Sequence, residues 1–439
     1  MKEEKIPRSY KILKEWIRFV VNTVYFKKAN VIDVKNVPAE GTPLLIVSDH
    51  QNSLTDALGI MLSLNDRKVH FITRADVFSV HPLATKFLYW LGLLPAFRLN
   101  FEGAEALSKN DSTFKVSEQN LLDGRTVVIY PEAGHQDKHW LGNFTYGYTR
   151  MAFGAAELGG FKTDVKILPS CNHYDEYYDL RTQQVIRYGT PISLEPYYEL
   201  YKTKPRTAQR QVNALVRKQI KDMMLSIDDV EHYAEIDYLR NSVPGRQAAI
   251  DANLDPDDLA QKLTSDKAYV GKLAGSGKSY ESVTKLLDSM KKLRVNDSTF
   301  DNPPSLAGIL GNCLILLLLL PFAIFALWPT VLCYFIPEYL SKKVGDKMLR
   351  SSFLLGMNIL FILPICGLIT LHITGFTGGW IRAIAYTLLL PFIACFEWYY
   401  YKFAVNTAAQ YRYYKAEKEG KIAPVKELRD KVHSEFTIK

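Results

Sequence analysis

The stretch PLLIVSDHQNSLTDALGIML, residues 43–62, passes from a short apolar run through a polar turn into a second apolar segment. Residues 44–47 are apolar without a break, and so short a run with two β-branched members is typical of a buried strand. Residues 56–63 are long enough for two helical turns, and we predict a helix there. A strand followed directly by a helix is the repeating unit of α/β folds.

The same alternation continues to about residue 198. Short apolar runs at 69–72, 126–130, 165–168 and 184–188 predict further strands, and the segments 82–91, 104–122 and 146–158 predict helices between them. Strands separated by helices pair in parallel, because each helix carries the chain back to the same end of the sheet. The sequence therefore predicts an α/β domain over residues 31–200, with a mostly parallel sheet flanked by helices.

Side chains with catalytic potential follow the first of these strands. His50 lies just past the predicted strand end, and Asp56 lies six residues further along. An imidazole can take a proton from a hydroxyl group, while a carboxylate holds its other ring nitrogen and stabilises the charged form. The pattern is a base and its orienting acid without a serine nucleophile, so the hydroxyl group of a substrate would itself attack.

Three further blocks follow in order: GLLPAFR at 92–98, YPEAGH at 130–135 and ILPSCN at 167–172. Together with the histidine block they resemble the glycerolipid (phospholipid/glycerol) acyltransferase superfamily, which includes the glycerol-3-phosphate and 1-acylglycerol-3-phosphate acyltransferases. The blocks of that family are His-x4-Asp, Gly-x-Ile-Pro-x-x-Arg, Phe-Pro-Glu-Gly and a late Ile/Val-Pro. Each block is a weak signal alone, but four in the family's order are specific. The resemblance covers about residues 32–192.

The resemblance implies transfer of a fatty acyl group from an acyl thioester to a hydroxyl group of glycerol-3-phosphate or 1-acylglycerol-3-phosphate, in phospholipid synthesis. The donor would be carried by coenzyme A or acyl carrier protein, and no cofactor is expected. His50 would be the general base and Asp56 its partner. Arg98 would bind the acceptor's phosphate as a bidentate donor. The other residues that would line or shape the acceptor site are Gly92, Pro95, Glu132, Gly134 and Pro169.

Two positions depart from the family's pattern. The spacing here is His-x5-Asp, and an extra residue inside the helix would turn Asp56 about 100° away from His50. The pair survives only if residues 51–53 supply the extra residue in the loop, and this longer spacing resembles a branch acting on glycerol-3-phosphate or dihydroxyacetone phosphate. The second departure is EAGH at 132–135, where the family has Glu-Gly-Thr-Arg. The second phosphate-binding arginine is missing, and we expect His135 or Lys138 to replace it.

Other polar clusters favour structural interpretations. His135, Asp137 and His139 could be imagined as metal ligands, but a polar turn after a strand is the preferred interpretation and no metal site is predicted. His173 could bind head groups, although we favour a turn there. His70, within an apolar run, is predicted to be a core histidine.

Composition limits the partners. The formal net charge is +8, which suits an anionic membrane surface. No basic stripe interleaved with aromatic residues and no nucleic-acid motif is present, so we predict no nucleic-acid partner. The five cysteines lack zinc-ligand spacing, and four of them lie in apolar C-terminal segments. We infer a reducing, cytosol-facing catalytic region without disulfides.

The segments that flank the α/β domain have different patterns. Residues 1–30 are predicted as an amphipathic helix in the membrane interface, with packing on the domain's own core as the alternative; its apolar face comprises Leu13, Trp16, Ile17, Val20, Val21 and Val24. Residues 201–303 are predicted to be a connector of polar helices with little core of its own. The run GSGKS at 275–279 lacks the glycine that a phosphate-binding loop needs at 272, where Lys272 stands, and is predicted to be a linker turn.

Long apolar runs dominate residues 304–402. Segments 353–371 and 381–401 are each close to the ~20 residues that cross a bilayer, and we predict transmembrane helices there. Lysines and arginines gather at 342–350 and in the tail 403–439, which places both regions in the cytosol. Thioester donors are made in the cytosol, so both ends of the run 306–336 would lie on that side. We therefore predict a re-entrant hairpin bent near Pro321, in an integral membrane protein with a cytosol-facing catalytic domain and a basic cytosolic tail.

Two rival functions stay open at this point. One is acylation of another lysolipid or of an amino-acid-linked lipid. The other is a non-catalytic membrane protein that binds lipids, which the two departures from the family's pattern suggest. Intact His50, Arg98 and Glu132 favour an enzyme, and its expected partners are membrane lipids and an acyl thioester donor.

Overall fold

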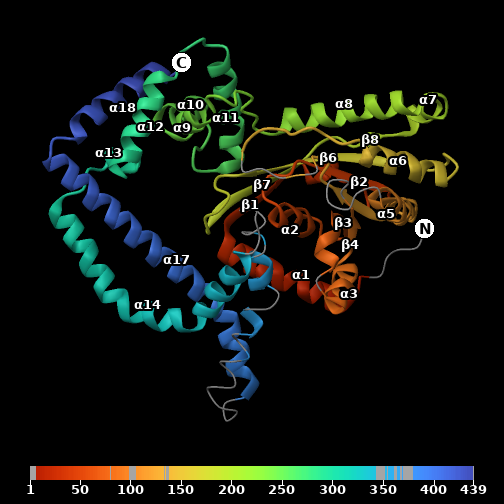
Figure 1. Cartoon of the computed structure of the whole chain (residues 1–439), viewed down its shortest axis with the longest axis horizontal. Coiled ribbons are helices and arrows are strands. Elements are labelled where there is room, and N and C mark those ends of the chain that lie inside the picture. The colour runs from red at the N-terminus through yellow and green to blue at the C-terminus, as the bar shows by residue number, and fades with distance from the viewer. Residues whose placement is uncertain are drawn as a thin grey trace.

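The structure is a computed structural model that describes residues 6–79, 81–97, 105–132, 134, 138–342, 352, 354–359, 363–365, 368 and 379–438. An eight-stranded sheet lies at the centre of the described N-terminal half (Figure 1). Its strands lie in the order β1-β7-β6-β2-β5-β3-β4, and β8 pairs with β6. Their bounds are β1 Phe26–Ile32, β2 Leu44–Ser48, β3 Val69–Arg74, β4 Leu93–Ala96, β5 Thr126–Ile129, β6 Lys166–Tyr174, β7 Thr182–Tyr188 and β8 Ile192–Ser193. Only the β6–β7 and β6–β8 pairings are antiparallel among those described.

Strand β2 lies in the middle of the sheet, and every one of its side chains is buried. Leu44 and Ile46 enter the core beneath helices α1 Arg8–Val20 and α2 Leu54–Ser63, whereas Leu45 and Val47 enter the core on the opposite face. Helices α5 Glu105–Leu122, α6 Gly147–Leu158 and α8 Pro205–Met223 cover that second face. A strand buried on both faces reads as an unbroken apolar run, which is the pattern of residues 44–47.

The predicted α/β architecture with a mostly parallel sheet is confirmed. The five predicted strands correspond to β2, β3, β5, β6 and β7, and the predicted helices to α2, α3 Pro82–Leu91, α5 and α6. Strands β1, β4 and β8 were not predicted. Strand β1 has the sequence FKKANVI with mostly partly exposed or exposed side chains, so it lacks the apolar run of the central strands.

Helix α1 corrects the prediction for residues 1–30. Its side chains Ile17 and Val20 are buried in the same core as Ile60 of α2 and Leu44 of β2. The apolar face predicted to lie in a membrane interface therefore packs on the protein itself, which was the alternative. The helical spacing of apolar residues identifies which face is apolar, but not what covers that face.

Six of the helices after residue 224 correct a further prediction, that residues 201–303 have little core of their own. They are α9 Tyr233–Asn241, α10 Val243–Asp251, α11 Leu259–Ala274, α12 Glu281–Leu293, α13 Ser298–Asp301 and α18 Ile422–Phe436. Ile236, Leu263 and Leu286 form a core of their own together with Val432 and Phe436 of α18. The segment 201–303 thus has a core, contrary to the prediction, and residues 422–436 of the predicted basic tail pack into it. The run GSGKS joins α11 to α12 as a turn, as predicted.

Helix α14, Leu306–Ser341, replaces the predicted re-entrant hairpin. It passes Pro321 without reversing direction and curves along its length (Figure 1). A proline removes one backbone hydrogen bond and bends a helix, but it does not by itself reverse the chain. Helix α17, Gly379–Lys418, lies beside α14, and Asn312 donates to Gln410 at 2.9 Å between them.

The membrane segments are supported in part. Within the described residues, one helix is long and apolar enough to span a membrane, namely Leu306–Leu327, of which 17% is buried in the protein. The predicted span 353–371 lies partly outside the described residues, and 381–401 lies within α17. The two predicted spans therefore stay predictions.

Candidate active site

The candidate site lies where three neighbouring strands end. His50 follows β2, Glu132 follows β5, and Asn172 lies near the end of β6. Strands β5 and β6 both pair in parallel with β2, so their carboxyl ends share one edge of the sheet. Open parallel sheets commonly bind ligands at this edge. The topology thus brings together the separate sequence blocks that contain these residues.

His50 and Asp56 form a hydrogen-bonded pair. The Nδ1 atom of His50 lies 2.8 Å from Oδ2 of Asp56, whose side chain is fully buried, while 17% of the His50 side chain is exposed. Helix α2 begins at Leu54, so the extra residue of the His-x5-Asp spacing belongs to the preceding loop. Ser53 in that loop has φ +45°, a conformation that L-residues rarely adopt. The loop takes up the extra residue there, and Asp56 faces His50.

Four hydrogen-bonding partners fix the Asp56 carboxylate. Besides His50, the backbone N–H groups of Gln51 and Asn52 donate to Oδ2 at 2.9 and 2.8 Å. The Tyr174 hydroxyl donates to Oδ1 at 2.6 Å. Asp56 lies in the first turn of α2, where a carboxylate also interacts favourably with the helix dipole. The carboxylate is held in one orientation, with Nδ1 of His50 on one side of it.

Glu132 braces the loop that carries His50. Its Oε1 accepts the backbone N–H of His50 at 3.0 Å, and its Oε2 accepts the backbone N–H of Gly142 at 2.7 Å. Burial raises the pKa of Glu132 above its usual value, although these two N–H groups oppose the shift. The Tyr130 ring stacks on the His50 ring, with centroids 4.2 Å apart. The block after β5 therefore positions both the backbone and the ring of His50.

The second sequence block has a structural explanation at two positions. Gly92 has φ +94°, and a Cβ there would lie 2.9 Å from the Val69 carbonyl oxygen, so the turn into β4 requires glycine. Pro95 lies in β4, where its carbonyl accepts the Thr113 hydroxyl at 2.7 Å. The Asn110 side chain bonds both the N–H and the C=O of Phe97, at 2.8 and 2.7 Å. Asn110 thus fixes the backbone immediately before Arg98.

Further residues predicted from the sequence are Arg98, Gly134, His135 and Lys138. Arg98 and His135 lie outside the described residues. Gly134 is described, and a Cβ placed on it would meet no atom within 4 Å. Lys138 lies over the Trp140 ring, 4.7 Å from its centroid.

The histidines set aside in the sequence occupy buried positions. His70 is 6% exposed in β3, in agreement with the prediction of a core histidine. His173 lies within β6 and not in a turn, because that strand continues to Tyr174. His139 is buried and bonds Tyr177 and Arg240. No group of three or more His, Cys, Asp or Glu side chains that could hold a metal occurs in the described part of the chain.

Sequence reasoning missed Tyr174 and Asp49. Tyr174 contacts Asp56 across 118 positions of the sequence, and no local pattern signals such a contact. Asp49 is fully buried, and its Oδ1 accepts the backbone N–H of Asn172 at 2.8 Å, which ties β2 to β6. Burial raises the pKa of Asp49 well above its usual value, and the nearby Asp56 raises it further. Its position next to His50 was the available signal.

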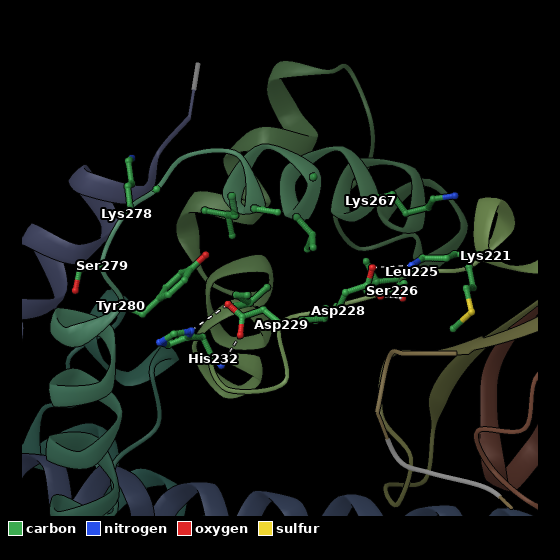
Figure 2. Close-up of a pocket in the computed structure, with 18 of the residues that line it drawn as sticks. Lys221, Leu225, Ser226, Asp228, Asp229, His232, Lys267, Lys278, Ser279 and Tyr280 are labelled. Carbon is green, nitrogen blue, oxygen red and sulfur yellow. Dashed lines mark hydrogen bonds and ion pairs between the residues drawn. The ribbon is translucent and has the colours of Figure 1, made fainter. Parts of the chain in front are cut away.

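A cavity of about 1060 Å³ lies elsewhere, in the helical domain (Figure 2). The loop after α8 and helices α9 and α11 line it, and none of the site residues above does. Its charged groups pair with one another, as Lys221 does with Asp228 at 2.7 Å and His232 with Asp229 at 3.0 Å. The cavity is therefore separate from the His50 site.

A family model matches the part of the chain that contains this site. Residues 28–172 match the model of the Acyltransferase family, and this region contains His50, Asp56 and Glu132. Among solved structures, the 1-acyl-sn-glycerophosphate (LPA) acyltransferase PlsC from Thermotoga maritima matches with 13% identity and a TM-score of 0.33, over 48% of this chain and 80% of that chain. No curated protein matches the chain. This chain is therefore similar to the acyltransferase family over residues 28–172.

Proposed function

We propose that this protein transfers a fatty acyl group from an acyl thioester to a hydroxyl group of a glycerol-phosphate compound. The observation that carries the proposal is the His50–Asp56 pair, joined at 2.8 Å at the carboxyl end of β2, inside the region that matches the acyltransferase family. The Asp56 carboxylate is fully buried, and three further donors hold it. A carboxylate fixed in this way can orient a neighbouring base.

The geometry supports a direct transfer. The acceptor hydroxyl gives its proton to Nε2 of His50 while its oxygen attacks the thioester carbonyl carbon. The tetrahedral intermediate then collapses, the carbon–sulfur bond breaks, and the imidazolium returns the proton to the leaving thiolate. Asp56 stabilises the imidazolium and keeps the proton of the neutral ring on Nδ1, so that Nε2 is the basic nitrogen.

The acceptor would lie beside the end of β4. We assign its phosphate to Arg98, whose preceding backbone Asn110 holds, with His135 or Lys138 as a second positive group. Gly92 and Pro95 shape the turn and the strand that precede Arg98 in the chain. Glu132 fixes the backbone of His50 by accepting its N–H. The proposed acceptors are glycerol-3-phosphate and 1-acylglycerol-3-phosphate, and the donor is acyl-coenzyme A or acyl carrier protein.

The proposed location is a membrane with the catalytic domain in the cytosol. The carrying feature is the apolar helix Leu306–Leu327, most of which is not covered by the described protein. Exposed side chains such as Leu317, Phe322 and Phe325 are each more than 60% accessible there, as suits a helix in lipid. A lipid product would then form next to the bilayer that receives it.

An assay of thioester cleavage tests the proposal. The full chain is purified in detergent and given palmitoyl-coenzyme A with glycerol-3-phosphate or with 1-oleoyl-glycerol-3-phosphate, and the released thiol and the lipid product are both measured. We expect acceptor-dependent thiol release and an esterified product, and a loss of at least about 100-fold in kcat for His50→Ala. A non-catalytic lipid-binding protein, the rival function, would release no thiol with either acceptor. A trapped acyl-enzyme would overturn the direct mechanism.

A further inference from the structure

A chain of hydrogen bonds between buried and partly buried side chains joins the His50 loop to the helical domain. The Tyr177 hydroxyl, in the loop between β6 and β7, donates to Oε1 of Gln51 at 3.0 Å. The same hydroxyl lies 3.1 Å from Nδ1 of His139, and Nε2 of His139 lies 2.8 Å from Nη2 of Arg240 in α9. Tyr177 and Arg240 both lie beyond residue 172, where the acyltransferase match ends.

Every bond in this chain has one direction, set by Arg240. A guanidinium group can only donate, so Nε2 of His139 must accept. Burial lowers the pKa of His139 well below its usual value, and the positive charge of Arg240 lowers it further, so the ring is neutral. A neutral imidazole that accepts at Nε2 carries its proton on Nδ1 and donates it to Tyr177. The single hydroxyl proton of Tyr177 is then directed at Gln51.

Tyr177 holds two of the residues that donate to Asp56. It accepts the Asn52 side-chain amide on its carbonyl oxygen at 3.3 Å and anchors the Gln51 side chain through its hydroxyl. The backbone N–H groups of these same two residues bind Oδ2 of Asp56. A displacement of Tyr177 would therefore move the amides that orient the partner of His50.

Arg240 is a rigid anchor for the chain. It is 2% exposed and bonds Asp266 at 2.8 Å and Asp237 at 2.7 Å, and Lys262 also pairs with Asp266. A buried charge that is compensated by several fixed partners has few alternative positions. The Arg240 guanidinium is thus held in place by the helical domain and not by the sheet.

We propose that Arg240, acting through His139 and Tyr177, is a positioning residue for the His50–Asp56 pair, an inference that rests on the proposed function. The helical domain then contributes one positioning residue to the site, although it lies outside the family match. Loss of any one of these hydrogen bonds leaves the His50 and Asp56 side chains unchanged but lets residues 50–52 shift. Because transfer requires the reacting atoms to be closely aligned, such a shift lowers kcat more than substrate affinity.

The test compares two variants with matched controls in the full chain, using the palmitoyl-coenzyme A assay. Tyr177→Phe removes one hydroxyl group and Arg240→Gln removes the anchor. Tyr269→Phe and Arg429→Gln are the controls, because Tyr269 has a buried hydroxyl bonded to Phe436 and Arg429 is a buried arginine paired with Asp297 and Asp301 in the same domain. We expect kcat to fall roughly 10-fold for each test variant with KM changed less than about twofold, and both controls to stay within about twofold in kcat.

A double-variant cycle adds a readout that general destabilisation would not move. The kcat of the double variant Tyr177→Phe, Arg240→Gln should lie only slightly below that of the less active single variant, because both changes break the same chain of hydrogen bonds. The double variant Tyr177→Phe, Arg429→Gln should instead lose kcat by the product of the two single effects. If Arg240→Gln does not fold, the comparison of kcat between Tyr177→Phe and its control Tyr269→Phe decides the question. Test variants that match their controls would overturn the positioning role while the wild type and His50→Ala still support acyl transfer. An inactive wild type would instead defeat the proposed function.

Discussion

The two domains bury their acidic groups in different ways. At the end of β2, Asp56 and Glu132 are held by backbone N–H groups, a hydroxyl group and His50, and no arginine or lysine pairs with them among the described residues. In the helical domain, Asp297 is bonded by Arg429 at 2.8 Å, and Asp266 by Arg240. Both arrangements satisfy a carboxylate that is buried, as Asp56 and Asp266 are, or partly buried, as Asp297 is, but the partners differ in charge.

The difference separates chemistry from stability. A carboxylate held by neutral donors keeps its full negative charge available to stabilise an imidazolium, which a neighbouring arginine would reduce. A carboxylate paired with arginine is already neutralised and serves to fix two elements together. The β2 site therefore suits the proton transfer that we propose, and the ion pairs of the helical domain suit holding its helices in place.

The largest expected effect is at Asp56. Asp56→Asn keeps the size of the side chain but removes its charge, and it places an amide where three N–H groups need acceptors. We expect kcat to fall about 100-fold, since the imidazolium loses its stabilising charge. Kinetics with palmitoyl-coenzyme A and glycerol-3-phosphate measure the loss, and circular dichroism verifies the fold. Near-normal turnover would mean that Asp56 is structural, like the acids of the helical domain.

A second expected effect concerns Arg98, the arginine that would bind the phosphate of the substrate. Arg98→Ala should raise the KM for glycerol-3-phosphate roughly 30-fold and change that for the acyl donor less than about twofold, with Arg98→Lys recovering part of the loss because lysine lacks the bidentate fork. Initial rates over both substrate concentrations separate the two constants. Equal changes in both would place Arg98 with the structural arginines.

A third prediction concerns stability without activity. Arg429→Gln leaves Asp297 without its cation, and we expect the free energy of unfolding to fall by about 1–3 kcal/mol. The activity of each folded molecule should stay unchanged, because Arg429 has no contact with the His50 site. Chemical denaturation and kinetics below the transition check the two statements. A selective loss of kcat would show that the separation between the two domains is incomplete.

The same contrast explains which parts of the fold could be predicted from the sequence. Strand β2 is fully buried and appears as an apolar run, and β5 and the first half of β3 are also buried. The His50 block was found because it directly follows β2. In the helical domain the core positions are spaced along polar helices, as Val283, Leu286 and Met290 are in α12. That spacing was visible, but the surrounding charge suggested a solvated connector.

The site contacts that the sequence did not predict are long-range. Tyr174 and Tyr177 reach the His50 loop from more than 100 positions away, and Arg240 reaches His139 across 101 positions. Such contacts depend on how the sheet orders its strands, since β6 lies beside β2 although β3, β4 and β5 intervene in the chain. Local periodicity contains no information about that order. The partner of the curved helix α14 was hidden for the same reason, because α17 follows it only after residue 378.

The smallest expected effect is a difference in sign between the two domains as pH changes. Burial raises the pKa of Asp49, so the folded state favours its protonated form, and the stability that this group contributes is present below its unfolded pKa and is lost as pH rises. For Asp297, burial alone would raise the pKa, but the hydrogen bonds and the charge of Arg429 outweigh burial and lower the pKa. The stability that Asp297 contributes is therefore present at neutral pH and is lost as pH falls toward acid. Relative to the wild type, Asp49→Asn should therefore gain in Tm as pH rises above about 4, near the pKa of an unfolded aspartate. Asp297→Asn should be less stable than the wild type at pH 8 and should recover only as pH drops below about 4. Shifts of about 2 °C are expected in a chain of this size, and calorimetry across the pH range resolves them. Parallel shifts in the two variants would contradict the contrast, because they would mean that the acids beside His50 are stabilised in the same way as the ion pairs of the helical domain.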